Sequence, residues 1–237
     1  MPSLADLRTA FGLIERYVAS PEPRLMTQAL KLISPALAKG KGEPSHVVAA
    51  ISEAAATFMP TTAELRTPLA ELLATLPTPA PNVLAAAKGP EPVTDQAKPE
   101  KRLPAKLPEH EVFIGLLALL LLLDMGNTTA AMPWALMLME RVAALKRRTL
   151  DPIAERVYFY ASWVFEKGNQ LAAIRSTLLA AYRTACLHHN TICQATLLNS
   201  LLRNLLHHKL FDQAEKLLTK TTFPEQATNA QASEKAP

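Results

Sequence analysis

The chain has 237 residues, 49% of them hydrophobic and only 7 of them glycine, which is enough for one core of ordinary size or two small ones. Its net charge of +4 is too small to indicate a nucleic-acid partner, and two cysteines are too few for a disulfide framework. Alanine and leucine outnumber the β-branched residues, and this balance predicts an all-α fold.

Residues 1–76 are predicted to form an N-terminal segment of four short helices. In residues 4–19, apolar side chains recur at helical spacing, at Leu4, Leu7, Phe11, Ile14 and Val18. The other helices are expected over residues 24–38, over 45–58 behind a Ser45 cap, and over 62–75 behind a Thr62 cap.

A proline-rich stretch follows this segment. Eight prolines lie between Pro77 and Pro108, mixed with charged residues and glycine. Proline interrupts a helix and pushes the preceding residue toward extended geometry. We therefore expect residues 77–108 to be a flexible, protease-sensitive linker.

Residues 109–226 are predicted to form a helical-repeat domain. Helices are expected at about 109–125, 130–147, 152–167, 170–189, 191–208 and 211–220. Turns fall at Gly126-Asn127, at Gly168-Asn169 and at Lys209, and each interval between them holds two antiparallel helices. A regular interval of roughly 40 residues with two helices per repeat is typical of an α-solenoid, and we expect a right-handed, TPR-like stack.

Two features bear on the cellular compartment. The apolar run Val112 to Leu123 is shorter than the roughly 20 residues that a spanning helix needs, and Glu109, Glu111 and Asp124 flank it. We expect a buried helix here and no membrane partner. Charged residues within the first twenty positions argue against a secretory signal, so a reducing compartment is expected.

Two clusters of side chains have a structural and a functional interpretation. The aromatics Tyr158, Phe159, Tyr160, Trp163 and Phe165 fall on several faces of the helix 152–167. Core packing is favoured over an aromatic ligand pocket. The basic residues Arg141, Lys146, Arg147 and Arg148 are interpreted as a solvated helix end rather than a localisation signal or an anion-binding patch.

Histidines and cysteines suggest a zinc site, but their spacing disfavours one. The pairs His188-His189 and His207-His208 end successive helices, about 27 Å apart at 1.5 Å per residue. Cys186, His189 and Cys193 flank one turn but lack a fourth ligand and a standard zinc spacing. We predict no stoichiometric zinc and treat both cysteines as small buried hydrophobes.

The chain also lacks the motifs of common enzymes. No glycine-rich phosphate loop, no H-E-x-x-H and no G-x-S-x-G occurs, and no pair of acid–base carboxylates is evident. Together with a helical repeat, this favours a binding scaffold. We predict no catalytic, cofactor-binding or metal-binding residue and assign no partner-binding residue.

The stretch from Arg175 to Gln226 carries a resemblance to a known family. Its elements include Gln194-Ala195-Thr196-Leu197-Leu198-Asn199, Leu201-Leu202-Arg203-Asn204, Phe211-Asp212-Gln213-Ala214-Glu215-Lys216 and Phe223-Pro224-Glu225-Gln226. Upstream, Arg147-Arg148-Thr149-Leu150-Asp151 and Tyr158-Phe159-Tyr160 also match. In these positions, about 107–226, the chain resembles a family of proteasome lid subunits, the non-ATPase regulatory subunit 3 family. The N-terminal segment, residues 1–76, matches only in helical style.

The resemblance implies a role. It implies a non-catalytic scaffold of the 26S proteasome regulatory particle, acting in ubiquitin-dependent protein breakdown in the cytoplasm and nucleus. The implied partners are other lid subunits, without a cofactor, small-molecule substrate, nucleic acid or membrane. The alternatives are a generic helical-repeat adaptor of a related PCI-type complex, or a truncated form that does not assemble.

The end of the chain leads to further expectations. The pattern stops after Gln226, where a polar tail over residues 227–237 begins, and we expect no PCI module. Helix 211–220 should present an apolar stripe for a following helix, made of Leu210, Phe211, Ala214, Leu217 and Leu218. We expect the chain alone to be marginally stable or to self-associate, and not to replace a whole family member in the lid.

Overall fold

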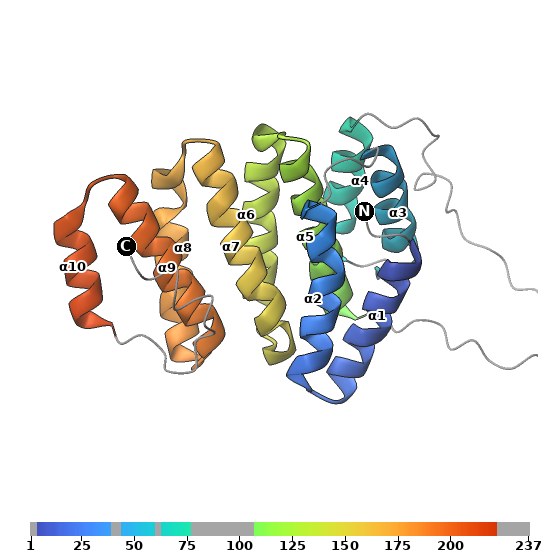
Figure 1. Ribbon diagram of the computed structural model, residues 1–237, viewed down its shortest axis with the longest axis horizontal. Helices are drawn as coiled ribbons and strands as arrows, with labels where there is room; N and C mark the ends of the chain where they lie inside the picture. Colours follow the sequence, from blue (N-terminus) through green and yellow to red (C-terminus); the bar gives the residue numbers. More distant parts are fainter. Residues whose placement is uncertain (1–3, 39–43, 60–62, 77–106, 222–237) are drawn as a thin grey trace, which may run out of the picture. The chain divides into compact units, whose positions relative to one another are not determined.

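A computed structural model describes residues 4–38, 44–59, 63–76 and 107–221 of the chain. Every regular element in these ranges is a helix, which confirms the all-α prediction (Figure 1). The chain divides into two compact units, Met1–Leu121 and Leu122–Pro237. The predicted linker lies outside the described residues except for Leu107 and Pro108, and the predicted tail lies outside them altogether.

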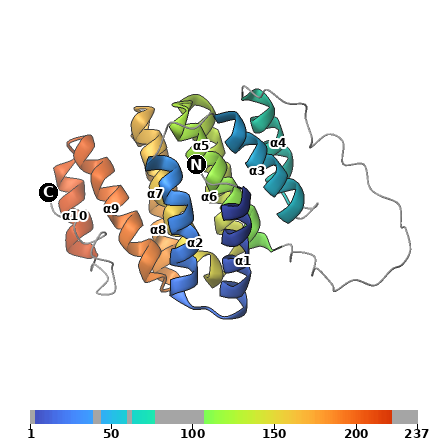
Figure 2. The ribbon, with the colours of Figure 1, turned by 45° about the vertical axis from the view of Figure 1, so that its right-hand side comes forward.

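Four complete helices belong to the first unit: α1 (Leu4–Ala19), α2 (Pro23–Ala38), α3 (Pro44–Phe58) and α4 (Arg66–Thr75). Helix α1 packs against α2 as an antiparallel hairpin and also contacts α3 (Figure 2). The bounds of α1 to α3 agree with the predictions within one residue. The fourth helix begins at Arg66 rather than at residue 62, because residues 64 and 65 form a turn.

Aromatic side chains form the centre of the first unit. The ring of Phe11, fully buried on α1, stacks on Phe58 of α3 with 4.2 Å between ring centroids. The rings of His110 and Phe113 meet Phe11 edge-on at 5.1 and 5.6 Å. Because these rings come from three helices, this one cluster joins α1, α3 and the start of α5 (Pro108–Asp124).

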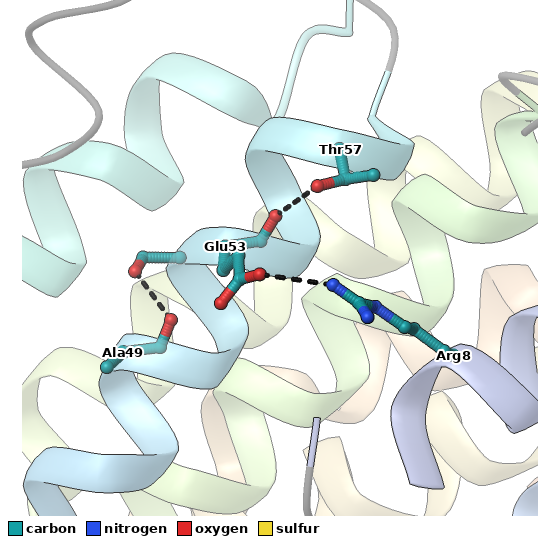
Figure 3. Close-up of polar contacts among 5 residues, drawn as sticks. Arg8, Ala49, Glu53 and Thr57 are labelled. Atoms are coloured by element: carbon teal, nitrogen blue, oxygen red, sulfur yellow. Dashed lines mark hydrogen bonds and ion pairs between the residues drawn. The ribbon is translucent and has the colours of Figure 1, made fainter. Parts of the chain in front are cut away.

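A polar contact between α1 and α3 lies at the surface (Figure 3). The guanidinium of Arg8 approaches the Glu53 carboxylate at 3.4 Å, and the two side chains are 62% and 54% exposed. Such an exposed pair contributes at most about 1 kcal/mol. The buried aromatic ring cluster therefore contributes more to the α1–α3 association than this exposed pair does.

Helix α5 is apolar on every face, as the run Val112 to Leu123 predicted. Its side chains from Val112 to Leu122 are almost all fully buried, and the acidic Glu109 and Glu111 at its start are buried as well. The Glu111 carboxylate accepts a hydrogen bond from the backbone N–H of Leu65 at 3.2 Å. Within the described residues, no helix is long and apolar enough to cross a membrane.

The second unit contains α6 (Thr128–Leu145), the short 3₁₀ helix η1 (Arg148–Leu150), α7 (Asp151–Lys167), α8 (Leu171–Leu187), α9 (Thr191–His207) and α10 (Phe211–Lys220). Helix α7 packs against α6, α8 and α9, and α9 packs against α8 and α10. Figures 1 and 2 show α7 to α10 as successive antiparallel helices. The predicted repeat domain, residues 109–226, overlaps this unit and also includes most of α5.

The turns of the second unit share one backbone feature. Each contains a residue in the left-handed region: Gly126, Lys146, Asn169, His189 and Lys209. The side chains of Asn127 and Asn190 then cap α6 and α9 by accepting hydrogen bonds from the backbone N–H groups three residues ahead. A left-handed residue thus follows each of the helices α5 to α9, and a side-chain cap begins the next helix at α6 and α9.

The turn after α7 shows why two neighbouring residues have different roles. A Cβ added to Gly168 would lie 3.0 Å from the Met132 sulfur, so any larger residue here would require the Met132 side chain to move. The left-handed conformation falls on Asn169 instead, with φ of 53°. The sequence placed the turn at the right dipeptide.

We expect Lys209→Gly to stabilise the second unit. Lys209 has φ of 56°, which costs an L-residue about 1–2 kcal/mol, whereas glycine adopts it freely. The extra freedom of glycine in the unfolded chain takes back about 0.5–1 kcal/mol, so a net gain of about 0.5 kcal/mol is expected. Lys216→Gly, inside α10, is the matched control and should cost about 1 kcal/mol. Urea denaturation followed by tryptophan fluorescence tests both; a loss of stability in Lys209→Gly contradicts the expectation.

Candidate protein-interaction site

A buried amide fastens α8 to α9. Asn204 on α9 is fully buried; its Nδ2 donates to the backbone carbonyl of Leu171, and its Oδ1 accepts from Nε of Arg175 at 2.9 Å. The contact joins positions 29 and 33 residues apart in sequence. Arg175 and Asn204 both lie in the stretch that carried the family resemblance, and the structure gives them a common task in holding one hairpin.

Further polar contacts fasten α7 to α9. The guanidinium of Arg203 pairs with the Glu166 carboxylate through two contacts, of 2.8 and 2.9 Å. At the other end of the helices, the Thr196 hydroxyl donates to Glu155 at 3.3 Å, and the Cys193 thiol donates to the backbone carbonyl of Asp151 at 3.4 Å. These contacts fix the alignment of the two helices along their length.

A groove of about 310 Å³ opens in the second unit. Its lining residues come from the second halves of α6 and α8, here called its walls, and from the first half of α7 and the start of α9, whose buried Ala154, Tyr158 and Cys193 form its floor. Small side chains leave the space open, namely Ala143 on α6, Ala154 on α7 and Ala180, Ala181 and Ala185 on α8. This groove was not predicted from the sequence. The alanines were visible, but helix spacing cannot be read from one sequence.

Charged groups surround one end of the groove. Lys146, Arg147 and Arg148 follow α6 and are exposed, and His188 at the end of α8 is exposed as well. These basic residues agree with the predicted solvated helix end, and they also line the groove. Burial raises the pKa of the Asp151 carboxyl, while the nearby Arg148 and His188 act to lower it.

The aromatic residues of α7 only partly follow the prediction of core packing. Tyr158 and Phe165 are buried, with burial raising the pKa of the Tyr158 hydroxyl above its usual range. Trp163, however, is 36% exposed, and its ring lies 5.8 Å from the Lys167 ammonium. The prediction was wrong for Trp163 because the surrounding helices leave this face of α7 uncovered.

Helix α10 exposes part of the predicted apolar stripe. Ala214 is buried against Leu198, Leu202 and Leu205 of α9, and Leu210 and Leu217 pack against the same cluster. Phe211 and Leu218 are 61% and 44% exposed. The part of the stripe open to another helix is therefore this pair, and the expected self-association stays a prediction.

The histidine pairs lie at the ends of successive helices. His188 and His189 follow α8, and His207 and His208 close α9, with 5.3 Å between the ring centroids of the second pair. Among the described residues, no group of three histidine, cysteine or carboxylate side chains is arranged to hold a metal ion. The expected absence of zinc stays a prediction.

The two cysteines should differ in reactivity. Cys193 is buried, and burial raises the pKa of its thiol, so it stays protonated and covered at neutral pH. Cys186 is half-buried on α8. We expect an aromatic disulfide reagent to modify Cys186 in the native protein and Cys193 only on unfolding. Cys186→Ser should abolish the native reaction and Cys193→Ser should leave it unchanged; the opposite pattern contradicts this assignment.

Comparisons with known proteins agree with this architecture. A family model described as "PSMD3-like, N-terminal TPR repeats" matches residues 2–234. Antiparallel helix pairs and the matched repeats together confirm the predicted TPR-like helical-repeat solenoid. The match extends over the N-terminal segment, residues 1–76, whose sequence had resembled the family only in its helical pattern.

Similar proteins bear one name, 26S proteasome non-ATPase regulatory subunit 3. The Dictyostelium discoideum protein is 46% identical over 123 residues, covering 52% of this chain and 24% of the relative. Homolog A of Arabidopsis thaliana is 44% identical over 136 residues, covering 57% and 27%. A Drosophila melanogaster protein, named as a probable 26S proteasome non-ATPase regulatory subunit 3, is 33% identical over 236 residues, covering 96% of this chain and 42% of the relative. The chain thus spans less than half the length of these relatives, and it belongs to the PSMD3-like family through that family's N-terminal TPR repeats.

Proposed function

We propose that the chain is a non-catalytic scaffold of the 26S proteasome regulatory particle lid, acting in ubiquitin-dependent protein breakdown. In this proposal it binds other lid subunits, works in the cytoplasm and nucleus, and needs no cofactor, small-molecule substrate, nucleic acid or membrane. The family match over residues 2–234 carries the proposal. The names of the relatives, which call them regulatory and non-ATPase, support the non-catalytic part.

Surface features of the second unit support a docking role. Helical repeats use their extended surfaces to bind other proteins. Leu187 at the end of α8 is 80% exposed, and Phe211 and Leu218 lie exposed on α10. Large apolar side chains in contact with water are stabilised when a partner covers them.

Affinity purification of the tagged chain from eukaryotic cells, followed by mass spectrometry, tests the proposal. We expect enrichment of lid subunits. The double variant Phe211→Asp/Leu218→Asp, which removes the exposed apolar pair of α10, should lower their recovery. Thr219→Asp, at an exposed polar position of the same helix, is the matched control and should not.

Recovery of no lid subunit under any condition would count against the scaffold role. Recovery of a different complex would favour the general adaptor. Recovery of no partner would favour a form that does not assemble.

A further inference from the structure

The groove between α6 and α8 has the size of a site for a few residues of an extended chain. Helix α7 packs against both walls, so its own side chains Ala154 and Tyr158 form a firm floor. A volume of about 310 Å³ is at the lower end of the range for ligand sites. It has room for a few side chains, whereas a whole helix is about 10–12 Å across.

The chemistry of the lining divides the groove into two parts. The alanines of α6, α7 and α8 make one part apolar, suited to an aliphatic or aromatic side chain. Lys146, Arg147, Arg148 and His188 stand where α6 and α8 end, about one helical turn beyond Ala143 and Ala185, and all four are exposed. The groove's own carboxylates, Glu140 and Asp151, are fewer than these basic groups, and Asp151 already lies near Arg148 and His188. The rim therefore keeps an excess of positive charge.

We propose that this groove binds an extended acidic segment of a partner protein, with an apolar side chain between the alanines and carboxylates beside Lys146 and Arg148. The positive rim selects the charge of the segment, and the alanine-lined part selects the apolar residue. Such a segment would be a further class of binding partner for the proposed scaffold. Binding it does not require that the chain belong to the proteasome.

A single-stranded nucleic acid fits the groove less well. Proteins that bind single strands stack the bases on exposed aromatic rings. The groove residues include two rings, Tyr158, with 8% of its surface exposed, and His188, a single exposed imidazole, and these do not form a row of stacking platforms. A peptide matches the apolar part better, because aliphatic side chains need no stacking platform.

The test uses the whole 237-residue chain and a displayed library of random nine-residue peptides. Selection on the chain, with counter-selection on Ala181→Trp, should enrich peptides that combine an apolar residue with at least two carboxylates. Ala181→Trp fills the groove and should weaken the enriched peptides about tenfold or more, as should Lys146→Glu/Arg148→Glu. Ala172→Trp, exposed on the same helix, and Lys216→Glu/Lys220→Glu on α10 carry the same changes away from the groove and should leave affinity within about twofold.

Each other outcome overturns the proposal. Enriched peptides without carboxylates, no groove-dependent peptide, or equal effects of groove and control variants all do so. Self-association of the chain that is lost in Ala181→Trp would assign the groove to a second copy. Circular dichroism checks that the variants fold, and if Ala181→Trp does not, the charge-reversed pair decides. Failure here leaves the scaffold proposal standing, because proteasome capture is measured separately.

Discussion

Replacing Phe11 with alanine is expected to destabilise the first unit by about 3–5 kcal/mol, the largest effect among the substitutions considered. Phe11 is fully buried and contacts three rings, those of Phe58, His110 and Phe113. Its removal deletes the transfer free energy of the ring and leaves a cavity between helices from distant parts of the sequence. The remaining rings cannot all move into this space, since each is held by its own helix.

Hydrogen exchange of the α1 and α3 amides measures this loss within the first unit. Amides that open with the unit should exchange faster by the factor that corresponds to the lost free energy. Phe211→Ala is the matched control, because Phe211 is 61% exposed, and it should change stability by less than about 0.5 kcal/mol. A loss below about 1 kcal/mol in Phe11→Ala would show that the ring cluster is not the centre of the unit.

Replacing Asn204 with alanine is expected to cost the second unit about 2–3 kcal/mol. The substitution leaves the Leu171 carbonyl and the Arg175 guanidinium without the amide that they contact. Unsatisfied groups at a buried position cost more than the net worth of the hydrogen bonds themselves. Both tryptophans, Trp134 and Trp163, belong to this unit, so tryptophan fluorescence during urea denaturation reports its unfolding.

A double-mutant cycle with Arg175→Met separates the amide–guanidinium contact from the rest. The sum of the two single losses in stability should exceed the loss in the double variant by about 1 kcal/mol, because either substitution removes the same contact. Gln213→Ala, at an exposed amide on α10, is the control and should change little. Additive effects, or a loss no larger than that of the control, would contradict the assigned role of Asn204.

Much of the fold followed from the sequence alone, because prolines and glycines mark where helices end. Prolines and glycines placed the bounds of α1 and α2 within one residue. The start of α4 was missed, since a possible cap at Thr62 looked the same as a real one. The 3₁₀ helix at Arg148–Leu150 was also missed, because a single turn leaves no periodic pattern.

The candidate site was less predictable for a physical reason. The Arg175–Asn204 contact joins residues 29 positions apart, and helical periodicity says nothing about which helices meet. The groove exists because alanines on three helices face one space, which one sequence cannot reveal. The exposure of Trp163 was mispredicted because a helix that is apolar all round indicates burial only when every side has a neighbour.

Sedimentation of the chain in a cell lysate tests the central claim most directly. A glycerol gradient of cells that express the tagged chain separates whole proteasomes from free subunits, and peptidase activity marks the proteasome fractions. The scaffold account predicts that part of the chain sediments with that activity and leaves those fractions when the lid is dissociated by salt. A chain that stays in the light fractions, while a known lid subunit in the same gradient sediments with the activity, would contradict it.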